Sequence, residues 1–151
     1  FKVGSALILR AQHPLLVQHV QAIATPLRDL RPKLCLLLAG HVRPRPSDLR
    51  LFAQRSEVEL VAELNQAESR RASRSPLLGE PFELVCMLSF GQDGAGVCSR
   101  SLRVPVTARY LTLLMLQGSG EFVQLCHLSV FGSVPELNFA GEQGGILFAE
   151  S

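Results

Sequence analysis

Residues 101–132, SLRVPVTARYLTLLMLQGSGEFVQLCHLSVFG, contain the pattern that decides the fold. A short strand through Val104-Pro105-Val106 runs directly into an apolar segment. A Gly-Ser-Gly turn then separates that segment from a last strand that ends at Phe131-Gly132. Apolar side chains occupy both alternating rows of residues 111–116, which is typical of a strand buried on both faces. The stretch therefore predicts the interior of a layered β fold.

Period-two alternation recurs elsewhere in the chain and predicts further strands. The clearest case is residues 57–64, where Val58 and Leu60 alternate with glutamates. The other expected strands are residues 34–39, 49–54, 82–90 and 102–106. Seven or eight short strands joined by turns predict a mainly β fold, an antiparallel jelly-roll β-sandwich.

A different periodicity appears near the N-terminus. Leu16, Val20, Ile23 and Leu27 recur at spacings of three and four, which predicts an amphipathic helix within residues 14–30. Pro26 favours a break before its last turn. The four residues would form an apolar stripe that is suited to docking a partner protein.

These patterns divide the chain into three parts. Residues 1–33 are expected to form an N-terminal strand and helix extension, residues 34–132 the β-sandwich, and residues 133–151 a C-terminal tail. Within the sandwich, residues 66–81 are rich in Ser, Arg and Pro and predict a mobile loop.

Composition narrows the class of protein. The chain has 151 residues, of which 47% are hydrophobic and 19% charged, so one folded domain is expected. Its net charge of +2 is too small to indicate a nucleic-acid partner. The longest apolar runs are far shorter than the roughly 20 residues of a membrane span. We therefore expect no membrane-spanning segment.

Four cysteines, Cys35, Cys86, Cys98 and Cys126, show no C-x-x-C spacing, so the sequence predicts no zinc site. Most of them lie in apolar runs, where a thiol acts as a small hydrophobic group. Reduced thiols in a cytoplasmic protein are the favoured interpretation. The alternative is a Cys86–Cys98 disulfide in an oxidising compartment.

The stretch quoted first resembles discoidin-type domains, in which an apolar-Pro-apolar strand runs into Ala-Arg-Tyr and the last strand ends in an apolar residue and Gly. Here these positions are residues 104–111 and 128–132. The resemblance covers about residues 34–132 and places the chain near the galactose-binding-like superfamily, which also includes DOC modules and SUN domains. It implies that partners engage loops at one end of a β-sandwich.

No catalytic pattern is found, and we expect neither an enzyme nor a cofactor. The four histidines are scattered along the sequence, and no Ser or Cys lies in a nucleophile-elbow pattern. The glycine-rich residues 91–96 lack the Lys-Ser/Thr of a phosphate-binding loop and the alternating oxygen ligands of a calcium loop. A hairpin turn is the better interpretation.

Several loop residues are instead candidates for partner contact. Arg43 and Arg45 lie in a basic stretch suited to an acidic partner, although a solvated loop is the default interpretation. Gln92, Asp93 and Gln117 lie in loops at which the family binds its ligands. The basic pair Arg70-Arg71 lies just before Ser73, which is thus a candidate phosphorylation site.

The sequence thus favours an intracellular protein-interaction or scaffold module, a subunit or domain of a larger assembly whose partners are other protein subunits. The alternative is an extracellular or lumenal module, in the endoplasmic reticulum or nuclear envelope, that recognises a glycan, a lipid or a protein.

Overall fold

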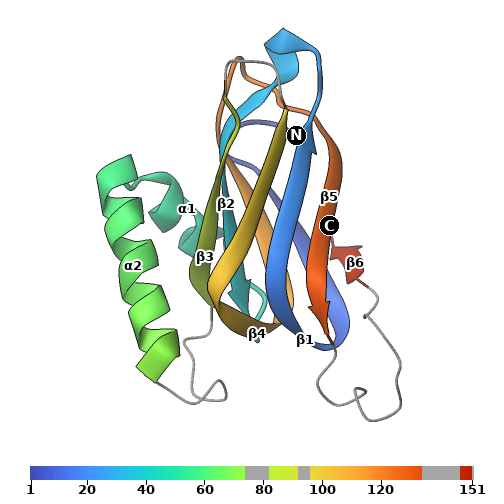
Figure 1. Cartoon of the computed structure of the whole chain (residues 1–151). Helices are drawn as coiled ribbons and strands as arrows, with labels where there is room; N and C mark the ends of the chain where they lie inside the picture. The colour runs from blue at the N-terminus through green and yellow to red at the C-terminus, as the bar shows by residue number, and fades with distance from the viewer. Residues whose placement is uncertain (74–81, 92–95, 134–146, 151) are drawn as a thin grey trace.

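The computed structural model describes residues 1–73, 82–91, 96–133 and 147–150. Five longer strands form the framework, and two helices lie beside it (Figure 1). In the sequence, the helices come after the second of these strands and before the third. In chain order the elements are β1 (Ala6–Ala24), the 3-10 turn η1 (Arg28–Leu30), β2 (Pro32–Gly40), α1 (Pro46–Ala53), α2 (Glu57–Ser73), β3 (Phe82–Ser89), β4 (Val97–Gly118), β5 (Leu125–Ser133) and β6 (Leu147–Glu150).

All strands belong to one antiparallel sheet with the order β3-β2-β4-β1-β5, and β6 pairs with the first half of β1. The long strands β1 and β4 pair along most of their length. The second half of β4 also pairs with β2, whereas residues 97–101 pair with β1 alone. One edge of this first half of β4 is therefore unpaired within the described chain.

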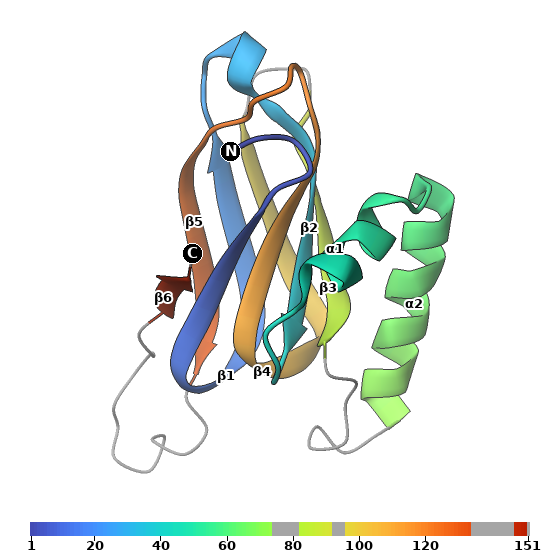
Figure 2. The ribbon, with the colours of Figure 1, turned by 180° about the vertical axis from the view of Figure 1, so that it is seen from behind.

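The sheet rolls up so that one of its faces surrounds the main core (Figure 2). Inward rows of β1, β2, β3 and β4 form a single cluster, in which Val17, Val20 and Met115 are fully buried. Many of the inward side chains are small, and small side chains let opposite walls of the roll approach closely. The small members are Ala11, Ala22, Ala24, Cys35, Ala39, Cys86, Cys98 and Ala108.

The outer face of β2, β3 and β4 is covered by the two helices, which create a second core. Leu36, Leu38 and Leu114 point outward from the sheet and pack with Phe52 of α1 and Leu60 of α2. The expectation that residues 34–39 and 111–116 are buried on both faces is therefore confirmed. One face meets the interior of the roll, and the other meets the helices.

The mainly β, antiparallel class is also confirmed. The jelly-roll sandwich is not confirmed, because the described strands form one rolled sheet. Residues 1–33 supply β1, an internal strand, and residues 147–150 add a short strand to it. The strands that flank residues 91–96 are separated by β2 in the sheet order, so they do not pair as arms of a hairpin.

The predicted N-terminal helix is wrong, because residues 14–24 belong to β1. The cause is a pair of register irregularities against β4, between Arg10 and Leu15 and between Val17 and His19. Against β5, Gln18 is an extra residue of β1 and breaks period two, so the inward residues Val17 and Val20 are three positions apart. A bulged strand thereby imitates the spacing of a helix.

The strands predicted at residues 49–54 and 57–64 are also wrong, since these residues form α1 and α2. The predicted loop at residues 66–81 is helical as far as Ser73, and residues 74–81 lie outside the described chain. Ser56 caps the N-terminus of α2, because its side-chain oxygen accepts the Glu59 N–H at 3.2 Å. This is half of a Ser-x-x-Glu capping box.

An ion pair fastens the C-terminal end of α2 to β3. The Arg71 guanidinium donates to Glu83 at 3.1 Å, and only 9% of each side chain is exposed. The Nε and one further nitrogen of Arg71 have no hydrogen-bond partner among the described residues. Loss of the Glu83 carboxylate would therefore leave a buried cation without compensation.

Glu83→Gln is expected to lower the free energy of unfolding by about 3–5 kcal/mol, because one partner of a buried pair is removed. Urea denaturation followed by circular dichroism measures this change. The matched control is the double variant Arg71→Met, Glu83→Leu, which removes both charges and should recover most of the loss. A single variant as stable as the wild type would contradict a structural role for the pair.

Gly132 lies where β5 approaches β1 most closely. A Cβ atom at this position would collide with the backbone carbonyl of Leu16, which is not at the tip of a flexible side chain. Gly132→Ala is therefore expected to destabilise the fold by about 1–3 kcal/mol, the usual cost of overpacking. Ser133→Ala in the same strand should change the urea midpoint little. Equal midpoints for the two variants would refute the close approach.

Candidate functional site

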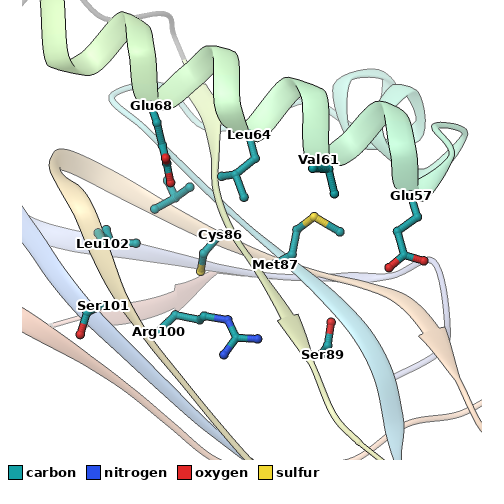
Figure 3. Close-up of a pocket in the computed structure, with 11 residues that line it drawn as sticks. Glu57, Val61, Leu64, Glu68, Cys86, Met87, Ser89, Arg100, Ser101 and Leu102 are labelled. Atoms are coloured by element: carbon teal, nitrogen blue, oxygen red, sulfur yellow. The ribbon is translucent and has the colours of Figure 1, made fainter.

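A pocket of about 320 Å³ opens where the rolled sheet fails to close, between β3 and the first half of β4, beneath α2 (Figure 3). We call it the seam groove. It is lined by three segments that are far apart in sequence. The lining residues are Glu57, Val61, Leu64, Glu68, Val85, Cys86, Met87, Ser89, Arg100, Ser101 and Leu102.

One wall of the seam groove is a single face of α2. Glu57, Val61, Leu64 and Glu68 follow one another at spacings of four, three and four, so they share one side of the helix. The adjacent side, with Leu60 and the buried Ala67, faces the sheet. Because the sheet holds only part of α2, the side that bears Val61 overhangs the groove, and 45% of Val61 is exposed.

The other walls are strand edges that pair with no strand among the described residues. β3 is hydrogen-bonded to β2 on one side only, and it ends the strand order. In the pairing of β3 with β2, Leu37 lies opposite Cys86, but the next residue, Leu38, lies opposite Leu84. Val85 is therefore an extra residue, which forms a β-bulge. Beyond the bulge, residues 86–89 are regular. They present backbone N–H and C=O groups toward the groove.

Arg100 brings a positive charge into the groove. It lies opposite the fully buried Val20 in the register of β4 and β1, so it belongs to an inward row. It nevertheless remains exposed, because the roll is open at this point. Its guanidinium donates to the carbonyl of Ser99 at 3.1 Å, which leaves most of its donors free for other acceptors.

Two carboxylates mark the opposite wall. Glu57 lies at one end of the groove and Glu68 at the other (Figure 3). Neither forms an ion pair within the described part of the chain. Between them lie the apolar side chains of Val61, Leu64 and Met87. The groove therefore has an apolar middle, two acidic ends on its helical wall and one cation on its strand wall.

The thiol of Cys86 in this groove is not a nucleophile. Burial raises its pKa from 9.0 to about 12, and the nearby Cys98 adds to the increase, while Arg100 and Arg71 act in the opposite direction. At pH 8 only about one thiol in 10⁴ is ionised, and the thiolate is the reactive form. No group of three metal-ligating side chains occurs among the described residues.

The predicted docking stripe does not exist as a surface. Val20 is fully buried in the roll, Leu16 and Ile23 are half-buried in β1, and Leu27 is 57% exposed just before η1. Strand geometry distributes these residues over different faces of the sheet. None of them lines the seam groove.

The predicted loop residues are likewise dispersed. Arg43, Arg45 and Gln117 are exposed and do not line the groove. The Arg45 N–H donates to the Asp48 carboxylate at 2.9 Å at the start of α1, which lowers the pKa of Asp48, and the Arg45 side chain adds to the effect. Gln92 and Asp93 lie outside the described residues. Contact of these five residues with a partner stays a prediction.

Ser73 is the last residue of α2 and is exposed, and its hydroxyl donates to the carbonyls of Ser69 and Arg70. Arg70 pairs with Glu63 at 3.8 Å, and Arg71 is held by Glu83. Both arginines of the basic motif are therefore engaged within the fold. A kinase that reads Arg71 would have to separate the end of α2 from β3, and phosphorylation of Ser73 stays a prediction.

No family model matches this chain, and no curated protein matches it either. The described helices include none that is both long and apolar enough to cross a membrane.

All four cysteines are free thiols, and only Cys126 is exposed. In the native protein at pH 8, iodoacetamide is therefore expected to add one group per chain, at Cys126, because the pKa of Cys35 and of Cys86 is raised to about 12. Intact-mass spectrometry counts the added groups. Cys126→Ser should remove the labelling, and urea should expose all remaining thiols. Two or more groups on the folded wild type would contradict this burial.

Proposed function

We propose that this chain is a non-enzymatic protein-interaction module, a domain or subunit of a larger intracellular assembly, and that the seam groove holds an extended segment of a partner protein. The observation that carries the proposal is the combination of a helix wall, unpaired strand edges and the apolar middle of the groove between them. A groove of this form fits β-strand addition, in which backbone hydrogen bonds supply affinity and side-chain pockets supply specificity.

The charges of the groove define the partner segment. Glu57 and Glu68 are eleven residues apart on α2, which is about 16 Å along the helix axis at 1.5 Å per residue. An extended chain covers this distance in about five residues. The matching segment carries two basic residues four or six positions apart, because only an even separation in an extended strand places both side chains on the face toward α2. Apolar residues lie between them for Val61 and Met87. Arg100 on the strand wall repels a segment whose basic residues point toward the sheet, and thus sets its orientation.

The alternative module for glycans or lipids has less support. It predicted a Cys86–Cys98 disulfide, and both thiols are unpaired and buried. Free thiols agree with a reducing compartment. The relation to galactose-binding-like domains stays a prediction that rests on residues 102–132.

The test begins with a phage-displayed library of random dodecapeptides that is selected on the immobilised chain. We expect enriched peptides with two basic residues four or six positions apart around an apolar centre. For a synthetic peptide of the enriched sequence, Val61→Lys should weaken binding at least about tenfold, because it places a charge in the apolar middle of the groove. Fluorescence anisotropy measures the dissociation constants.

Val58→Lys is the matched control, since Val58 is 80% exposed on the same helix and does not line the groove. Its dissociation constant should stay within about twofold of the wild type. Glu57→Lys should weaken binding, whereas Glu59→Lys, outside the lining, should not. If no peptide is enriched, or if Val61→Lys and Val58→Lys bind alike, the proposed function is wrong.

A further inference from the structure

The outer edge of β5 is unpaired as well. β5 ends the strand order on the side opposite to β3, and its outer edge pairs with no strand among the described residues. Its sequence, LCHLSVFGS, contains no Lys, Arg, Asp, Glu or Pro. Exposed edges are usually protected against pairing by charges, prolines, bulges or a covering element.

The opposite edge has several of these protections, which confine the strand addition proposed above to residues 86–89, beyond the bulge of β3. β3 carries the bulge at Val85 and the acidic Glu83, α2 packs against it, and the inward charge of Arg100 stands beside it. The pairing of β5 with β1 is irregular at two points. At the start of β5 the extra residue is Cys126, and opposite Phe131 and Gly132 the extra residue is Gln18, which belongs to β1. The seven residues of β5 after Cys126 therefore contain no extra residue and form a charge-free edge.

We propose that this edge pairs with the same edge of a second copy of this chain, antiparallel, about a two-fold axis at Ser129. Such an isologous contact uses one surface twice, and residues near the axis face themselves or close neighbours. A charged residue there would meet an identical charge, which is destabilising between opposed strands. Because β5 contains no Lys, Arg, Asp or Glu, two copies of the strand can pair along their whole length without opposing like charges.

The side chains around Ser129 are complementary under this symmetry. On the outer face, His127 of one copy lies opposite Phe131 of the other, which is 49% exposed in the single chain. Phe131 already contacts a histidine within its own chain, since its ring lies 5.5 Å from that of His19. On the inner face, the half-buried Leu128 and Val130 lie opposite each other. Each exposed or half-buried ring or aliphatic group near the axis thus gains an uncharged neighbour.

Sedimentation equilibrium of the wild-type chain tests the dimer. The weight-average mass should rise from near 16.5 kDa toward twice that value between about 5 µM and about 500 µM, because a single strand pair forms a small, concentration-dependent interface. Ser129→Glu and Ser129→Lys should each remain monomeric, since like charges then face each other across the axis. An equimolar mixture of the two variants should regain the dimer.

Ser99→Glu and Ser99→Lys are the matched controls. Ser99 lies in the same outward row as Ser129, across Gln21 of β1, but away from the edge of β5. These controls should dimerise like the wild type, and so should Val61→Lys, which tests the seam groove separately. A wild type that stays monomeric over the whole range overturns the proposal. A charge-swap mixture that stays monomeric while both variants are folded by circular dichroism also overturns it.

Discussion

The fold depends on one constraint, which is that the central strands β2 and β4 are apolar on both faces. Leu37 and Leu113 point into the roll, while Leu36, Leu38 and Leu114 point away from it. Each fully buried leucine contributes about 1.5–3 kcal/mol relative to an exposed one. A sheet rolled on itself buries only the inner row. The outer row requires a cover, and the chain supplies it between β2 and β3 as α1 and α2.

The position of this cover creates the seam groove. α2 is fixed to the outer face by Leu60 and Ala67, and its C-terminal end is fixed to β3 by the Arg71–Glu83 pair. Nearer the middle of α2, Glu63 pairs with Arg55 at 3.4 Å, and the Arg55 guanidinium lies 4.6 Å from the centre of the Phe52 ring. These contacts connect α2 to α1. The helix is thereby held along the open side of the roll. The same contacts that complete the core thus determine the width and the charge of the groove.

The sequence predicts the interior of this fold well and its periphery poorly, for physical reasons. Two apolar rows at residues 111–116 permit only a strand covered on both sides, and the structure confirms this. Residues 57–64 satisfy both period two and a helical stripe, so alternation alone cannot distinguish them. The Ser56–Glu59 cap and the strong helix formers that follow it were the deciding signals. The groove joins three distant segments through tertiary packing, and no local pattern encodes that.

The small side chains of the inward rows bear on how such a protein can act. Alanine and cysteine line much of the roll, so its walls pack against one another and the interior serves stability. Burial raises the pKa of Cys35 and of Cys86, so these two thiols are held as apolar groups. In the function proposed above, recognition then falls to the unpaired edges of the sheet. The edge of β3 lies under a helix and beside charges, which suits a selective contact with a different chain. The edge of β5 is uncharged and pairs with no strand among the described residues, which suits pairing with an identical strand. The asymmetry between β3 and β5 thus separates two kinds of association on one scaffold.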